Sequence, residues 1–298
     1  MMLEIKNLSL TLEDKVILRK INLKIQEGKI YGLIGPNGVG KTSLIKCLTG
    51  IYKPSIGEVL FDGDNVYDNA KVKARIGYVA DENSFFNSFK IIDIVKYYKL
   101  TYENFDEEKF HNINKVFKIP MKRRFFQLSK GMKMRVALMA AFAQNPDYLI
   151  LDEPTSGLDP ILKNKLLKLL VKEVSERNVT IIISSHHLNE LERICDDVAI
   201  IDKGEVSYQN TLEDMKRKIK KIQVAFDEPI YEEDLNLEGI FKISRIGRVF
   251  TIITDNYGED FINSLEKFKP LFIEEIDLSL EDIFIYKVDG GEEIEEII

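Results

Sequence analysis

Cysteine is scarce in this chain, and that scarcity argues against a disulfide-stabilised scaffold. Only two cysteines, Cys47 and Cys195, occur among 298 residues, far apart and each inside an apolar segment. Secreted domains that depend on disulfides carry a denser set. We therefore expect two reduced thiols in the core of a cytosolic protein.

Long hydrophobic runs are also missing. A helix that spans a bilayer needs about 20 consecutive apolar residues, whereas about the longest run here is Ala137–Ala143. Charged residues interrupt Met1–Lys6, where a signal peptide would need its apolar stretch. We expect a cytoplasmic protein, whose place at the inner face of the cell membrane would depend on a partner.

Positive charge is not in excess either. The net charge is −7, and no basic arm suited to nucleic acid is present, so we expect no nucleic-acid partner. The short basic cluster in Lys216–Lys221 is better explained as a solvated helix end. Internal repeats and low-complexity linkers are absent, and 45% apolar residues suffice for an ordinary packed core.

What the chain does contain is a regular succession of predicted strands and helices. Strands with alternating apolar and polar residues dominate the first 65 residues. The continuous apolar run Ile30–Ile34 is typical of a buried parallel strand, and helices are expected at about Lys41–Leu48 and Pro160–Arg177. The stretch from Ile91 to Asn145 is helical in pattern. This spacing of strand, helix and strand predicts βαβ units and a parallel sheet.

The pattern changes after Asp202–Gly204. Short strands and helices follow, in a mixed arrangement that would suit a small ferredoxin-like lobe. We therefore expect a main domain over residues 1–215, with a helical part at about 84–145, and a small C-terminal α+β domain over 216–288. The last residues, 289–298, form an acidic tail that we expect to be loosely ordered.

A phosphate-binding loop is the first motif with clear chemistry. It lies between a predicted strand and a predicted helix, as the P-loop mechanism requires. Its backbone N–H groups would converge on phosphate oxygens. Lys41 would reach the β- and γ-phosphates of ATP, and Thr42 would offer its hydroxyl to Mg²⁺. The motif reads Gly35-Pro36-Asn37-Gly38-Val39-Gly40-Lys41-Thr42, and Ser43 completes the expected ATP-binding stretch.

Two carboxylates end a second buried strand. Asp152 and Glu153 follow the apolar run Tyr148–Leu151, where the desolvation of two acids is costly unless a cation and phosphates offset it. Asp152 fits a Mg²⁺ role, directly or through water. Glu153 fits a general base or a residue that orients the attacking water. The alternative is a salt-bridged strand end with no catalytic role.

Three further segments complete a set of motifs known from one protein family. Leu128–Met132 resembles the signature of ABC ATPases, Glu153–Pro160 resembles their Walker B to D-loop run, and Ser184–His187 resembles their switch-histidine segment. The motifs occur in the family's order over roughly residues 3–210. The resemblance implies an α/β P-loop NTPase fold with a RecA-like core, an N-terminal antiparallel β subdomain and a helical signature subdomain.

That resemblance also implies how ATP is bound. Two subunits, either two copies of this chain or one copy with a homologous subunit, would form a head-to-tail dimer with two ATP molecules at its interface. Ser129 and Gly131 would contact the γ-phosphate of ATP bound to the partner, and Asp159 would help link the two sites. His186 would contact the γ-phosphate within its own subunit, whereas a structural or surface role is favoured for His187.

The chain departs from the family's common pattern at three places. Leu12, followed shortly by Val16, stands where an aromatic residue commonly stacks on adenine, so apolar contact would have to substitute. Asp81 occupies the Q-loop position, where glutamine is common; it could reach Mg²⁺ through water, but it would repel a γ-phosphate at close range. Lys130 and Met132 replace a glycine and the glutamine of the common signature.

A membrane partner is implied as well. In transporters of this family, the Q-loop and the helices after it receive the permease, and that region maps to about Asp81–Arg124. One or two exposed aromatic residues would suffice for docking, although packing inside the helical part accounts for most of the apolar residues here. They are Phe85, Phe86, Phe89, Ile91, Ile92, Ile94, Tyr97 and Tyr98.

We therefore expect the ATP-binding subunit of an export-type ABC transporter that works with a separate integral membrane permease. One alternative is a soluble ABC protein that acts on ribosomes or DNA, but the second ATPase domain, long coiled coil or metal-binding cysteines usual in such proteins are missing from this sequence. The other is an ATP-dependent switch that regulates a partner with little hydrolysis, which Asp81 favours and Glu153 disfavours.

Overall fold

The computed structural model describes residues 2–83, 86–227, 230–235 and 237–289, with only the backbone for 286–289. The chain divides into two compact units, Met1–Ser207 and Tyr208–Ile298. This division precedes the boundary expected after residue 215, and the domain limits drawn from the sequence stay a prediction. The expected acidic tail lies almost wholly outside the described residues, as does Phe85.

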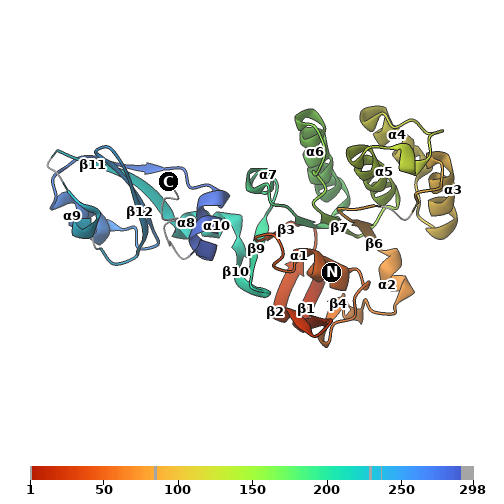
Figure 1. Ribbon diagram of the computed structural model, residues 1–298, viewed down its shortest axis with the longest axis horizontal. Coiled ribbons are helices and arrows are strands. Elements are labelled where there is room, and N and C mark those ends of the chain that lie inside the picture. Colours follow the sequence, from red (N-terminus) through yellow and green to blue (C-terminus); the bar gives the residue numbers. More distant parts are fainter. Residues whose placement is uncertain (1, 84–85, 228–229, 236, 290–298) are drawn as a thin grey trace. The chain divides into compact units, whose positions relative to one another are not determined.

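A four-stranded antiparallel sheet opens the first unit, in the order β2-β1-β4-β5 (Figure 1). Alternate side chains of its strands are buried, for example Leu3 opposite Ile25 and Ile5 opposite Leu23. The period-two pattern of the sequence therefore predicted the inward face correctly. The strands are β1 (Met2–Leu12), β2 (Lys15–Gln26), β4 (Ile56–Phe61) and β5 (Asp64–Asn65).

The central sheet has six strands in the order β10-β9-β3-β8-β7-β6. The pairs β6/β7, β7/β8, β8/β3 and β3/β9 are parallel. Because the carboxyl ends of parallel strands lie at one edge of the sheet, the loops that follow β3, β7 and β8 meet there. The strands are β3 (Ile30–Ile34), β6 (Ile76–Val79), β7 (Tyr148–Asp152), β8 (Thr180–Ser184), β9 (Asp197–Asp202) and β10 (Glu205–Thr211).

Local signals set the helices of this unit. Ser129 caps α5 by accepting the Met132 N–H, and Asp159 caps α6, with proline at its first position. Figure 1 shows α3, α4 and α5 grouped together, as the sequence predicted for the helical part. The helices are α1 (Lys41–Leu48), α2 (Ala70–Ala74), α3 (Ile91–Thr101), α4 (Glu107–Phe117), the 3₁₀ turn η1 (Phe125–Gln127), α5 (Lys130–Ala143), α6 (Pro160–Arg177) and α7 (Leu188–Glu192).

The second unit contains a four-stranded antiparallel sheet in the order β12-β13-β11-β14. With η2 in place of a first helix and α9 as the second, this is the strand order of a ferredoxin-like fold. Its core includes Val224, Phe250 and Leu265. The elements are α8 (Leu212–Lys218), β11 (Lys220–Phe226), the 3₁₀ turn η2 (Glu232–Leu235), β12 (Ile240–Ile246), β13 (Val249–Thr254), α9 (Glu259–Glu266), β14 (Pro270–Ile276) and α10 (Leu280–Asp289).

Candidate active site

The glycine loop between β3 and α1 is tightly enclosed by neighbouring backbone. A Cβ atom on Gly35 would lie 2.4 Å from the carbonyl oxygen of Ile201, and one on Gly40 would lie 2.7 Å from a methyl carbon of Leu18. Gly40 also has φ +110, a left-handed conformation that glycine adopts without strain. The loop therefore needs glycine at both positions, and the first N–H groups of α1 remain available for an anion.

Lys41 folds back over this loop. Its Nζ donates hydrogen bonds to the carbonyl oxygens of Gly35 at 2.6 Å and Pro36 at 2.9 Å. Burial lowers the pKa of the Lys41 ammonium, and the negative charges of Glu153 and Asp152 act in the opposite direction. The predicted phosphate-binding lysine thus lies within electrostatic range of both predicted acids.

Asp152 is almost completely buried at the end of β7, with 1% of its surface exposed. Ser184, which lies opposite it at the end of β8, donates its hydroxyl to Asp152 Oδ1 at 2.6 Å. The same hydroxyl accepts the Glu153 N–H at 3.1 Å. Ser184 was not among the site residues predicted from the sequence, although a polar residue that ends a buried apolar strand was a usable signal.

Glu153 has a strained backbone and a direct partner. Its φ of +49 is uncommon for a residue with a side chain, and such strain is concentrated at functional sites. One carboxylate oxygen lies 2.8 Å from His186 Nδ1. The structure thus joins the predicted general base to the predicted switch histidine. The ring centroids of His186 and His187 lie 4.0 Å apart. Burial lowers the pKa of His187.

The signature segment packs against the loop that follows Glu153. A Cβ atom on Gly131 would lie 2.2 Å from the carbonyl oxygen of Gly157, so only glycine allows this approach. Ser129, Gly157 and Asp159 are exposed beside this contact. Gly131 and the helix-capping Asp159 therefore have structural functions within their own chain. Their contacts with the ATP of a partner stay a prediction.

Val16 precedes a residue that packs against the glycine loop. It is 45% exposed on β2, and the next residue, Ile17, has its carbonyl oxygen and a methyl carbon within 3.5 Å of a Cβ built on Gly40. Contact of Val16 with adenine stays a prediction. Ile17 was not singled out from the sequence, because only the packing of β2 on the loop brings it there.

The residues present are compatible with Mg²⁺ bound mainly through substrate. Within the described ranges, no cluster of three or more His, Cys, Asp or Glu side chains could hold a metal ion. Mg²⁺ commonly uses one or two carboxylates together with phosphates and water. Asp152 and the exposed Thr42 fit that pattern. Asp81, the third predicted metal residue, forms an ion pair with Lys130 at 2.8 Å.

Together these features define a P-loop nucleoside triphosphatase. A glycine loop, a buried lysine, a strand-end aspartate and a glutamate–histidine pair meet at the carboxyl edge of a parallel sheet. This arrangement can hold a triphosphate, neutralise its charge and activate water at its terminal phosphate.

Comparison with known proteins identifies the family. Residues 18–156 match the family model described as ABC transporter. The ABC transporter ATP-binding protein YtrB of Bacillus subtilis is 31% identical over 97% of this chain and 99% of its own length. The bacitracin transport ATP-binding protein BcrA of Bacillus licheniformis is 30% identical over 91% and 92%. A dimeric bacterial ABC transporter cassette, MJ0796, is 25% identical with a TM-score of 0.62, over 70% of this chain and 98% of its own.

The chain belongs to the ABC transporter ATP-binding proteins. It is an ATP-binding subunit of such a transporter and an ATPase, and its fold is that of the family's cassettes. The expected fold class is therefore confirmed. In the part of the chain that the structure describes, no helix has both the length and the apolar character needed to cross a membrane.

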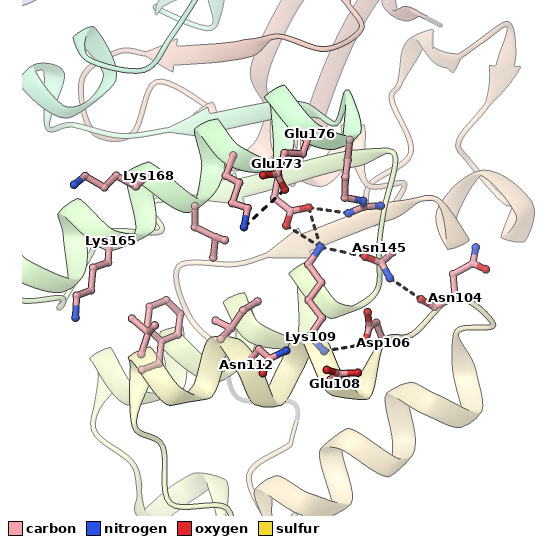
Figure 2. Close-up of a pocket in the computed structure, with 16 residues that line it drawn as sticks. Asn104, Asp106, Glu108, Lys109, Asn112, Asn145, Lys165, Lys168, Glu173 and Glu176 are labelled. Atoms are coloured by element: carbon pink, nitrogen blue, oxygen red, sulfur yellow. Dashed lines mark hydrogen bonds and ion pairs between the residues drawn. The ribbon is translucent and has the colours of Figure 1, made fainter.

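A separate cleft of about 1210 Å³ lies between α4 and α6 (Figure 2). Lys109 of α4 reaches across it to Glu173 of α6 at 2.7 Å and donates to Asn145 at 3.1 Å. Arg177 contacts the same glutamate at 2.7 Å. Burial lowers the pKa of the Lys109 ammonium, and Glu173 opposes that change. These contacts tie α4 of the helical part to α6, so we assign the cluster a structural role.

Replacing Glu173 with alanine is expected to destabilise the protein by about 3 kcal/mol, because it leaves the half-buried Lys109 without its carboxylate. Urea unfolding followed by circular dichroism measures the change. Glu176→Ala is the matched control: this exposed residue of α6 faces Lys172 at 3.7 Å and should cost about 0.5 kcal/mol or less. Equal effects of the two substitutions would contradict the structural role of the cluster.

Proposed function

We propose that this subunit hydrolyses ATP at the interface of a head-to-tail dimer and drives an export-type membrane permease. The permease would hold the subunit at the cytoplasmic face of the membrane. The partner in the dimer would be a second copy of the chain or a homologous ATPase subunit. The dimeric cassette and the bacitracin transport protein among its relatives support this proposal.

The observation that carries the proposal is the exposed surface formed by Ser129, Gly157 and Asp159. The N-terminus of α5 lies within it and favours negative charge. This surface does not include the chain's own phosphate-binding loop. An ATP molecule held on the loop of another subunit is therefore a suitable occupant. A dimer in which each subunit supplies one loop and one such surface would enclose two ATP molecules.

Each residue of the chain's own loop and acids then has a chemical task. Lys41 and the loop N–H groups would hold the β- and γ-phosphates, and Thr42 and Asp152 would hold Mg²⁺. The ion would supply charge neutralisation at those phosphates. Glu153 would accept the proton of the attacking water, and His186 would orient that carboxylate and approach the γ-phosphate.

A groove of about 430 Å³, bounded by α3, α5 and β6, is a suitable docking surface for the permease. Its walls include Tyr78, Phe86, Tyr97 and Phe125. Packing accounts for part of the aromatic and apolar stretch, since Ile91 and Ile94 are buried. Other members are exposed and available to a partner: Phe89 41%, Ile92 44% and Tyr97 41%.

Replacing Tyr97 with glutamate is expected to weaken permease binding by about tenfold or more, because it puts a charge into an apolar contact. The ATPase activity of the isolated subunit should not change. Affinity for the detergent-solubilised permease and stimulation of ATPase activity are the measurements. Tyr67→Glu is the control, since Tyr67 is also 41% exposed but lies outside the groove. Equal losses in both variants would reject this docking surface.

Purification of the subunit in mild detergent tests the whole proposal. We expect one integral membrane protein to co-purify and to stimulate ATP hydrolysis. Inside-out vesicles that contain both proteins should accumulate the transported substrate when ATP is supplied outside. Co-purification with ribosomes would favour the soluble alternative, and a partner regulated by ATP binding without turnover would favour the switch.

A further inference from the structure

Two positions at which this chain departs from the common ABC pattern contact each other. Asp81, which follows β6 closely, and Lys130, the first residue of α5, are 49 residues apart in the sequence numbering but lie 2.8 Å apart, Oδ1 to Nζ. The side chains are 38% and 53% exposed. Asp81 raises the pKa of Lys130, and the nearby negative charges of Glu82 and Glu153 add to this effect.

The backbone on both sides of Lys130 is held in place. Ser129 caps the helix by accepting the Met132 N–H at 3.3 Å, and Gly131 touches Gly157. The long side chain of Lys130 is therefore the part free to change partner. Because both side chains are partly exposed, the ion pair is weak and screened by salt, so a stronger anion can displace Asp81.

We propose that Lys130 is a further phosphate ligand that acts between subunits. In the free subunit it is held by Asp81, and when two copies close on ATP it exchanges this carboxylate for the terminal phosphate of the nucleotide bound to the other copy. The inference rests on the proposed head-to-tail dimer, which places that phosphate at Ser129 and Gly131, on either side of Lys130. A terminal phosphate carries more negative charge than one carboxylate and therefore attracts the lysine more strongly.

This exchange predicts opposite effects for the two members of the pair. Removing the charge of Asp81 frees Lys130 in the resting subunit and so favours closure on ATP. Removing Lys130 deletes the phosphate contact and so disfavours closure. A pair with a purely structural function would give losses in both cases, and an Asp81 that binds Mg²⁺ would give a loss on Asp81→Asn.

The experiment measures the dissociation constant of the ATP-induced dimer by analytical ultracentrifugation, in a Glu153→Gln background that slows hydrolysis. We expect Asp81→Asn to tighten the dimer about threefold and Lys130→Ala to weaken it about tenfold, consistent with loss of a charge-assisted hydrogen bond. Lys130→Arg should retain most of the affinity. In the double variant, Asp81→Asn should have no further effect, because its partner is gone.

Lys133→Ala is the matched control, since the ammonium of this lysine, on the same helix, lies 5.6 Å from the centroid of the Phe125 ring and forms a different contact from that of Lys130. It should leave the dimer unchanged. Weaker dimers for both Asp81→Asn and Lys130→Ala, or no change for either, would overturn the proposal. If the Glu153→Gln parent itself fails to dimerise with ATP, the head-to-tail dimer is wrong, and this inference is rejected with it.

Discussion

Replacing Glu153 with glutamine is expected to lower the ATP turnover number by about 10²- to 10⁴-fold while ATP still binds. The amide has nearly the same shape as the carboxylate but cannot accept the proton of the attacking water. Its carbonyl oxygen can keep the contact with His186, which lies 2.8 Å from the native carboxylate, so the site should keep its geometry. Without hydrolysis, we expect ATP to hold the dimer closed.

Two measurements check this prediction: phosphate release at saturating ATP, and molecular mass in the presence of ATP. Glu108→Gln makes the same chemical change at an exposed position on α4 and should alter neither quantity. A Glu153→Gln variant that hydrolyses ATP at the wild-type rate would reject Glu153 as the general base. It would also leave the strained backbone at this residue, with φ +49, without a catalytic explanation.

Replacing Ser129 with arginine is expected to abolish turnover that depends on the dimer while leaving ATP binding to the monomer largely intact. Ser129 lies exposed at the N-terminus of α5. An arginine there would occupy the space assigned to the phosphates of a partner. The chain's own glycine loop, between β3 and α1, and Lys41, the first residue of α1, belong to a different segment and would be unaffected.

Titration of the monomer with a fluorescent ATP analogue, alongside turnover at increasing protein concentration, separates the two effects. Ser129→Ala removes the same helix cap, at a cost of about 1 kcal/mol, without the added bulk, so it controls for lost stability. It should retain measurable turnover. If Ser129→Arg instead blocks nucleotide binding to the monomer, the assignment of Ser129 to the partner's ATP is wrong.

Many secondary elements followed from local patterns in the sequence. The helices Lys41–Leu48 and Pro160–Arg177 and the strand Ile30–Ile34 were predicted with the bounds that the structure has. Such elements depend on caps, glycines and apolar periodicity within a few residues, which a sequence displays directly. The cap at Ser129 is also local, because its hydroxyl accepts the N–H of Met132, three residues along the chain. The P-loop motif could be recognised for the same reason, since its residues are contiguous.

Contacts between distant segments were decided by the tertiary structure alone. The polar end of a buried strand marks Ser184 as a residue of interest, but its partner Asp152 is decided by β8 lying beside β7 in a parallel sheet. In the same way, only the packing of α5 brings Lys130 to Asp81.

The family could therefore be predicted from local motifs, and the comparisons confirm it. The same motifs led us to predict the loop for ATP and the acids beside it. Only the fold shows which groups meet: Glu153 with His186, Gly131, whose missing Cβ atom lets α5 approach Gly157, and Asp81 with Lys130. The physical reason is that local conformation depends on neighbouring residues, whereas these contacts depend on the order of strands and the path of loops between them.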